Sequence, residues 1–236
     1  MIPESKPKNR LLSTLPQEDW KRICSHFDEV RLSRGDVLVD VGEPFRKLYF
    51  PAAGVVSAVT IFKTGSTAEM ATMGVEGMIG IGACLGSRVS LSRHVVQVPG
   101  SALMTGYNEF KRFEQDISAF RSIILAYSQA FTVQLLQSVA CNAVHSVQER
   151  TARWLLTCHD KSEADAFSLT QEFLSEMLGV SRPIVNTAAQ TLQRAGLIQY
   201  NRGNITILDR SGLEEASCEC YTIIRQAYEQ RSIHLK

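Results

Sequence analysis

The side chains best suited to contact another molecule lie in one stretch of the chain, between positions 170 and 202. Polar residues recur there every three or four positions, so that on a helix they would share one face. These residues are Arg182, Asn186, Thr187, Gln190 and Arg194. Arginine can donate two hydrogen bonds to guanine O6 and N7, and asparagine or glutamine can make a similar pair with adenine. The pattern therefore predicts a surface that reads the base edges of double-stranded DNA.

Two short helices would position this face. Thr170 is suited to cap the first helix, and Gly179 to end it in a left-handed conformation. Ser181 would cap the second helix, with Pro183 in its first turn, where the missing N–H costs nothing. Gly196 would end it. Two helices joined by a tight turn that contains glycine form a helix-turn-helix.

Two β-prone segments follow, Leu197–Tyr200 and Ile205–Leu208, on either side of a turn that contains Asn and Gly. They predict a hairpin, the wing of a winged helix, with Arg202 at its tip. Base contacts are expected from Arg182, Asn186, Thr187 and Gln190, with Pro183 offering apolar contact to a thymine methyl group. Phosphate contacts are expected from Thr170, Gln171, Ser181, Arg194 and Arg202. The alternative is a helical hairpin whose polar face contacts protein.

The charge of the chain favours DNA only when it is read by segment. The formal net charge is +1, and residues 146–236 hold ten Lys and Arg against eleven Asp and Glu. Residues 180–210, however, hold four arginines and a single acid, Asp209. Positive charge is thus concentrated on the predicted DNA-facing surface, which has almost no acid. Acidic residues elsewhere in residues 146–236 offset this positive charge.

The N-terminal half has a different pattern. Eleven of the fifteen glycines fall between Gly35 and Gly106, and they separate short apolar and β-branched segments. This predicts an antiparallel sandwich or barrel, with hairpin turns at 34–36 and 64–66. Residues 116–146 then contain neither Gly nor Pro, and they predict one long helix with two apolar stripes. The stripes comprise Ile117, Phe120, Ile124, Tyr127, Phe131 and Leu135 on one side, and Ile123, Ala130, Leu136 and Ala140 on the other.

Two stripes need two partners, which would be the sheet of the same chain and the same helix of a second subunit. The alternative is a single-chain core helix with a wide apolar face. After this helix, Ser146 and Glu149 form a capping-box pattern that begins the next one.

Together these features resemble the cyclic-AMP receptor protein/fumarate-nitrate reductase regulator (CRP/FNR) superfamily of bacterial transcription factors. The resemblance covers nearly the whole chain, and its motifs are VQERTARWL at 147–155 and LTQ…LGVSR at 169–182. Arg182 matches the base-reading arginine of the family, whereas Pro183 and Thr187 stand where glutamate and a second arginine are common. The operator is therefore expected to differ from that of the best-known members.

The resemblance implies an α+β fold with a cyclic-nucleotide-binding-like β-roll sensor (residues 1–116), a dimerisation helix (117–145) and a winged helix-turn-helix domain (146–236). It implies a homodimer on a roughly palindromic operator, and RNA polymerase as a further partner if the protein is an activator. The expected compartment is the cytoplasm, because the sequence shows neither a transmembrane segment nor a secretory signal peptide. The effector motif of the family is degenerate here, with Glu76 before Gly77 and Ser92 before Arg93. A cyclic nucleotide is one candidate effector, and Arg93 would then contact its anionic phosphate. The alternative is that Arg93 forms an ion pair with Glu76.

The remaining features are expected to carry no chemistry. The six cysteines form no CxxC pair, and Cys218 and Cys220 on a helix would point to different faces, so reduced thiols are favoured over a metal or redox switch. No clustered N-terminal cysteines are present for an iron–sulfur centre, and His26 and His94 are more readily structural than haem ligands. No transmembrane segment and no catalytic motif is expected, and hence no enzyme. The alternative function is a ligand- or redox-responsive interaction protein.

Overall fold

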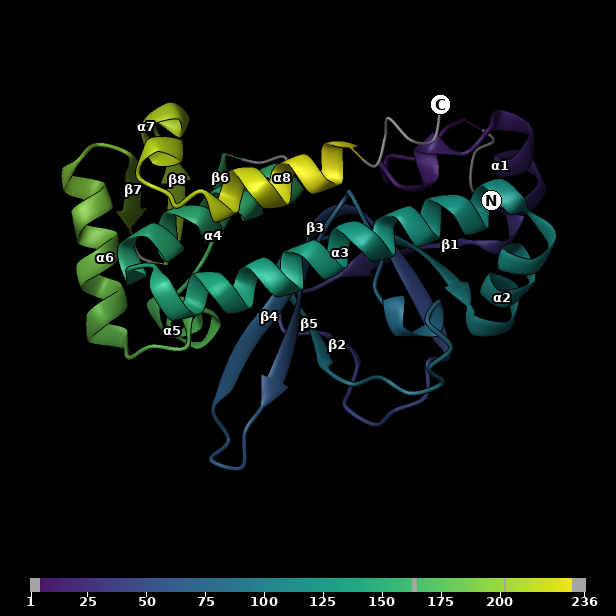
Figure 1. Ribbon diagram of the computed structural model, residues 1–236, viewed down its shortest axis with the longest axis horizontal. Helices are drawn as coiled ribbons and strands as arrows, with labels where there is room; N and C mark the ends of the chain where they lie inside the picture. Colours follow the sequence, from purple (N-terminus) through teal and green to yellow (C-terminus); the bar gives the residue numbers. More distant parts are fainter. Residues whose placement is uncertain (1–4, 163–164, 202, 231–236) are drawn as a thin grey trace.

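The computed structural model describes residues 5–162, 165–201 and 203–230. An antiparallel sheet with short helices forms the N-terminal half, one long helix crosses the face of the molecule, and helices with a small sheet form the C-terminal part (Figure 1). This arrangement confirms the predicted α+β class, with a β-roll first and a winged helix-turn-helix last.

The first sheet is built on two long antiparallel strands, β3 (Lys47–Ile61) and β5 (Arg93–Gly106). Its strand order is β1-β5-β3-β4, and β2 also pairs with β5. The shorter strands are β1 (Asp28–Leu32), β2 (Val37–Val39) and β4 (Thr67–Met73). Register shifts interrupt the β3–β5 ladder between Pro51 and Val56, and such bulges let a sheet bend around its core. Gly54 lies in this region with φ +90, where a Cβ would come within 2.5 Å of the Val98 carbonyl oxygen.

The two predicted hairpins have different outcomes. The turn at 64–66 joins β3 to β4 as a hairpin, as predicted. The hairpin predicted at 34–36 is wrong, because β1 and β2 do not pair with each other. Both pair with β5, which is long enough to take β1 along Gly100–Met104 and β2 at His94 and Val95.

Short helices complete the N-terminal half, and one long helix follows it. The short ones are α1 (Gln17–Ile23), α2 (Tyr107–Asp116) and the 3-10 turns at Leu12–Thr14, Cys24–His26 and Ile81–Ala83. The long helix is α3 (Ser118–Val144). Phe120, Ile124, Tyr127 and Phe131 of its first predicted stripe are buried in the core of the β-roll.

The second predicted stripe of α3 does not form one face. Ile123 and Ala130 are buried, whereas Leu136 and Ala140 are exposed. The apolar contact of α3 with the β-roll is therefore wide in its N-terminal half. Apolar side chains are uncovered in the half that leads to the C-terminal part.

The C-terminal part begins with α4 (Val147–Ser162), whose start carries the predicted capping box: Ser146 N–H donates to Glu149 Oε2 (2.8 Å), and Glu149 N–H donates to Ser146 Oγ (3.3 Å). Within the described residues, four more helices and three strands follow. They are β6 (Ala166–Ser168), α5 (Gln171–Leu178), α6 (Arg182–Arg194), β7 (Ile198–Asn201), β8 (Asn204–Ile207), α7 (Arg210–Glu215) and α8 (Cys220–Gln230). The strands form an antiparallel sheet in the order β6-β8-β7.

The two halves share a hydrophobic core. Val55, Val59 and Val98 of the β-roll pack in one cluster with Trp154 of α4 and with apolar residues of α5 and α6. Two buried polar contacts cross the same boundary: Trp154 Nε1 donates to Glu69 Oε1 (2.9 Å), and Lys161 Nζ pairs with Glu76 Oε1 (2.9 Å). Movement of the C-terminal part relative to the β-roll would therefore have to break apolar and ionic contacts together.

Among the described residues, α3 is the one helix that is long and apolar enough to span a membrane by length and composition, with mean hydropathy 1.3. The core helix of a globular protein meets the same criteria. Here, 44% of the most apolar window is buried against the rest of the chain. The hydropathy of α3 is accounted for by one face against the β-roll and an apolar exposed face.

Candidate nucleic-acid interface

Helices α5 and α6 are joined by the tight turn that the sequence predicts. Thr170 Oγ1 accepts a hydrogen bond from the N–H of Phe173 (3.2 Å), which caps α5. Gly179 has φ +64 and ends α5 in the left-handed conformation. Ser181 occupies the N-cap position of α6 with extended backbone but makes no capping bond through its side chain. The Ser181 hydroxyl therefore forms no hydrogen bond with the backbone at the start of α6.

One face of α6 is exposed to solvent, and it carries most of the predicted base-reading side chains. Arg182, Pro183, Thr187, Gln190 and Arg194 are exposed. The opposite face buries Val185, Ala188, Ala189 and Leu192. In Figure 1, α6 lies at the outer edge of the molecule, on the side away from the β-roll. The structure thus brings these five residues together on an accessible surface.

Asn186 is half-buried, and its amide belongs to a bridge between the two helices. Its Oδ1 accepts from Gln171 Nε2 of α5 (2.8 Å) and lies 3.5 Å from Gln190 Nε2. Because that oxygen is the atom that would accept from adenine N6, Asn186 must exchange a bond to Gln171 before it can read an adenine. Gln190 is more exposed and needs less rearrangement.

The predicted face contains an acid that sequence reasoning did not place there. Glu172, in the first turn of α5, pairs with the guanidinium of Arg182, and both side chains are about 60% exposed (61% and 59%). The prediction of a face with almost no acid is therefore wrong in one place. Glu172 is ten positions before Arg182 in sequence and reaches it only because the turn folds α5 against α6.

The hairpin predicted after α6 is present as β7 and β8, paired from Ile198–Ile207 to Asn201–Asn204. Helix α6 ends at Arg194, and Gly196 follows with φ +74. The N–H of Tyr200 donates to Gln193 Oε1 (2.7 Å), which fastens this wing to the end of α6. Arg202, predicted at the tip, lies outside the described residues. Strand β6, which was not predicted, adds a third strand to the wing through β8.

Comparison with known proteins identifies this region. A family model described as a Crp-like helix-turn-helix domain matches residues 149–216, which include α5, α6 and the wing. The C-terminal part of the chain, over residues 149–216, therefore matches the Crp-like helix-turn-helix domain family.

Solved structures, one of them from the crp/fnr family, share the fold along most of the chain. FixK2 from Bradyrhizobium japonicum matches with a TM-score of 0.70 and 14% identity, over 81% of this chain and 98% of that one. The c-di-GMP-responsive regulator CLP from Xanthomonas campestris gives 0.66 and 16%, over 81% and 99%. A putative crp/fnr-family regulator from Eubacterium rectale gives 0.62 and 16%, over 92% and 99%. No curated protein sequence gives a significant match.

The four candidate effector residues do not form one site, because Glu76, Ser92 and Arg93 each contact different partners. Arg93 makes a bidentate pair with Asp40, Nε to Oδ1 at 3.0 Å and Nη2 to Oδ2 at 2.6 Å, which holds the pKa of Asp40 below its usual range. Glu76 instead pairs with Lys161 of α4. The alternative pairing of Arg93 with Glu76 is not formed, because Arg93 pairs with Asp40 and Glu76 with Lys161. Ser92 is buried, and its carbonyl oxygen accepts from Ser90 Oγ (2.7 Å).

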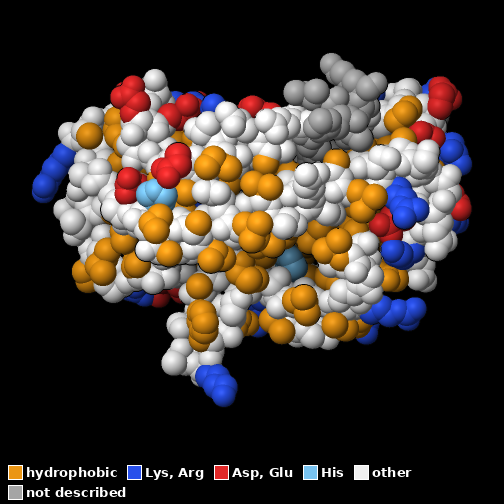
Figure 2. Space-filling view, in the orientation of Figure 1, with side chains coloured by type: hydrophobic (Ala, Val, Ile, Leu, Met, Phe, Trp, Pro, Cys, Tyr) orange, Lys and Arg blue, Asp and Glu red, His pale blue; other side chains and the backbone are white. Residues whose placement is uncertain are grey.

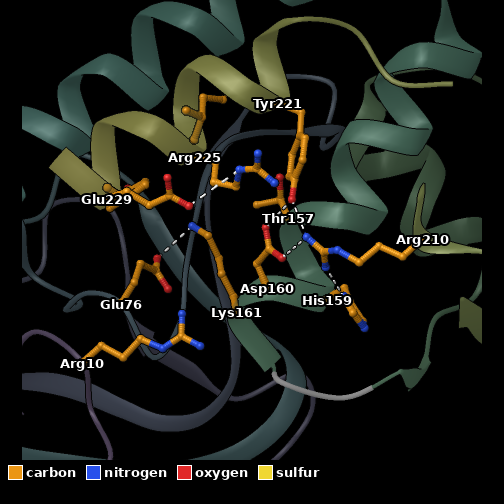
Figure 3. A pocket seen from close by; sticks show the side chains of 12 residues that line it. Arg10, Glu76, Thr157, His159, Asp160, Lys161, Arg210, Tyr221, Arg225 and Glu229 are labelled. Atoms are coloured by element: carbon orange, nitrogen blue, oxygen red, sulfur yellow. Dashed lines mark hydrogen bonds and ion pairs between the residues drawn. The ribbon is translucent and has the colours of Figure 1, made fainter. Parts of the chain in front are cut away.

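Glu76 does line a pocket of about 510 Å³, which lies where the β-roll meets α4, α7 and α8 (Figure 3). Lys161, Arg210 and Arg225 point into the same space, with Asp160 and Tyr221 beside them. Gly77, Ser92 and Arg93 do not line it. The sequence did not predict this pocket, because its walls come from the N-terminal segment, the loop after β4 and the C-terminal helices, which are far apart in the chain.

Proposed function

We propose that the chain is a homodimeric, sequence-specific DNA-binding regulator of transcription. The observation that carries this proposal is the exposed polar face of α6, which has an apolar face opposite and a wing beside it. We assign base contacts to Arg182, Asn186, Thr187 and Gln190, with Pro183 packing against a thymine methyl. Phosphate contacts are assigned to Thr170, Gln171, Ser181, Arg194 and Arg202.

A second copy of the chain is the proposed partner of α3. Seven exposed residues of this helix alternate three and four positions apart, the spacing of a coiled-coil seam. They are Ser122, Leu125, Gln129, Thr132, Leu136, Val139 and Ala143. Leu136 and Val139 are 67% and 72% exposed, and hydrophobic side chains gather over α3 on this face of the molecule (Figure 2). Two such helices would place two α6 faces for a roughly palindromic operator, about 34 Å apart.

The β-roll is proposed to be the sensor, with an unassigned effector that binds in the pocket beside Glu76. A ligand there would touch the β-roll, α4 and α8 at once, and so would bias how the two halves pack. In the cytoplasm, RNA polymerase is a further partner if the regulator activates transcription.

Selection of bound genomic fragments tests this function. We expect one enriched, roughly palindromic sequence, released by salt as phosphate contacts are lost. Repeating the selection with cell extract tests for an effector, which would change the enrichment. If no DNA is retained while a protein partner is, the winged helix binds protein and the proposal is wrong.

Arg182→Ala is the matching variant. We expect it to weaken binding to the selected operator by about 1–3 kcal/mol and to relax sequence preference at one base pair. Arg88→Ala, an exposed arginine on the β-roll, is the control for lost charge. Equal losses on operator and unrelated DNA would show that Arg182 does not read a base.

A further inference from the structure

Four side chains that commonly bind metals converge at the C-terminal end of α3. Cys141 lies in the last turn of α3, and His145 immediately follows the helix. Cys218 precedes α8, and Cys220 begins it. Their three Sγ atoms and one imidazole nitrogen all lie within 4.8 Å of one another.

The spacing of these four atoms fits a single ion. Cys141 Sγ is 3.5 Å from Cys218 Sγ, and Cys220 Sγ is 3.6 Å from His145 Nδ1. A tetrahedral zinc site with Zn–S bonds of about 2.3 Å has sulfur atoms about 3.8 Å apart. The four side chains therefore need only small shifts to share one ion. An iron–sulfur cluster would need its ligands farther apart, because they bind different iron atoms.

The side chains around the four ligands are arranged as they are at known metal centres. His145 Nε2 lies 3.1 Å from Glu219 Oε2, which leaves Nδ1 to face the thiols. A carboxylate on the far nitrogen of a metal-binding histidine fixes its ring and raises its basicity. Gln137 Nε2 lies 3.2 Å from Cys220 Sγ, so it can donate to a thiolate there.

Burial and charge also favour a bound cation over a simple packing of thiols. Cys141 and Cys220 are fully buried, and Cys218 nearly so. Arg150 and Arg153 of α4 are close enough to interact electrostatically with the Cys141 thiol. The Nε atoms of both arginines are buried without a hydrogen-bond partner among the described residues. Three thiolates, a neutral imidazole and Zn²⁺ carry a net charge of −1. With the Glu219 carboxylate on His145 the charge is −2, which the two guanidinium groups would balance.

We propose that Cys141, His145, Cys218 and Cys220 bind one structural zinc ion. Binding would replace three thiol protons, which are released to solvent, by three Zn–S bonds, and His145 would bind through the lone pair of Nδ1. The ion would tie the end of α3 to the start of α8. This site is independent of the proposed DNA contacts and can be tested without DNA.

The test uses the full chain, purified under reducing conditions. We expect about one zinc per chain by elemental analysis, and release of protons when zinc is added to the metal-free protein. Cobalt added in place of zinc should give the visible bands of a tetrahedral site and a sulfur-to-cobalt absorption in the near ultraviolet. The cobalt spectrum is measured on the natural sequence, so it does not depend on whether a variant folds.

Two variants assign the site. Glu219→Gln, at an exposed position, should lower the zinc affinity about 10–100-fold in competition with a chelator, because it alters the carboxylate partner of His145. Cys218→Ser should weaken the cobalt thiolate absorption, because one of three thiolate ligands is lost, and it should lower the zinc affinity. Cys84→Ser, a control thiol in the β-roll, should leave both unchanged. Equal zinc affinity and equal cobalt absorption in Cys218→Ser and Cys84→Ser would overturn the proposal. So would a metal-free protein that forms a Cys141–Cys218 disulfide and gives no tetrahedral cobalt spectrum after reduction.

Discussion

Arg182 and Glu172 form an exposed ion pair between the two helices of the DNA-binding motif. The guanidinium donors that guanine would accept are held by a carboxylate in the free protein. In the proposed complex, DNA would therefore have to displace Glu172 from Arg182, and the freed carboxylate would remain beside the phosphates. We expect the ion pair to weaken DNA binding.

Replacement of Glu172 tests this competition. Glu172→Gln should strengthen binding to all DNA by about 0.2–1 kcal/mol, the usual worth of an exposed ion pair, because it frees Arg182 and removes a negative charge near phosphate. Titration of a labelled operator and of an unrelated duplex measures the change. Glu176→Gln, an exposed acid later on α5, is the control. Weaker operator binding in Glu172→Gln would instead mean that Glu172 positions Arg182 for readout.

His94 makes a pH-dependent contribution to stability. Burial in the β-roll lowers its pKa from 6.5 to about 4, because the charged imidazole loses its hydration. A group with a depressed pKa in the folded state contributes stability above its unfolded pKa, and this is lost as the pH falls toward the folded value. We therefore expect stability to decrease from pH 6.5 to 4.

Urea unfolding of the natural protein and of His94→Gln, followed across this pH range, measures the contribution. The difference in unfolding free energy between the two should shrink as the pH falls, because only the natural protein must keep an imidazole uncharged. His26→Gln, at a surface position, is the matched control. A constant difference would show that His94 is already accommodated in its charged form.

At the scale of elements, α3 serves two surfaces at once. Its inner face completes the core of the β-roll, and its exposed seam is free along the C-terminal half. Because the seam residues make little contact within the chain, substitutions there can weaken dimerisation without changing the stability of the folded monomer.

Leu136→Glu should convert the proposed dimer to a monomer with little change in the unfolding midpoint of the monomer. Two like charges would face each other across the seam, where they cannot be hydrated. Sedimentation equilibrium gives the mass. Leu91→Glu, at a leucine on the β-roll that is 84% exposed, is the control. An unchanged dimer mass in Leu136→Glu would place the interface elsewhere.

At the scale of the whole molecule, the two halves are held by a shared core and by the buried Lys161–Glu76 pair. Removing one partner of a buried ion pair leaves an uncompensated charge, which costs about 3–5 kcal/mol. Lys161→Met should therefore lower the stability of both halves together. The methionine side chain is close in length to the lysine stem and therefore keeps part of its packing.

The two tryptophans report on this coupling separately, since Trp20 is buried in the β-roll core and Trp154 in the shared core. In Trp20→Phe and Trp154→Phe backgrounds, fluorescence should give the same urea midpoint, and Lys161→Met should lower both by similar amounts. Lys21→Met, at an exposed lysine of α1, is the control. Two separate midpoints would show that the halves unfold independently.

Local signals in the sequence predicted much of the fold and the exposed polar face of α6. Thr170, Gly179 and the capping box at Ser146 and Glu149 behave as expected, because caps depend on backbone groups only a few residues away. The exposed face of α6 also follows from helical periodicity alone. The 34–36 hairpin failed because strand pairing depends on a third, distant strand.

The sequence by itself thus determined the order of elements, the cap residues and the polar face of α6, all of which are set by neighbours within a few positions. Only the tertiary structure decided which distant groups meet. It placed Glu172 on Arg182 and Glu76 on Lys161, and it drew Cys218 and Cys220 to Cys141 and His145. Cys218 lies before α8 rather than on it, so the expectation that the two thiols point apart did not apply. Such contacts depend on how the helices pack against each other, which the spacing of residues along the sequence does not predict.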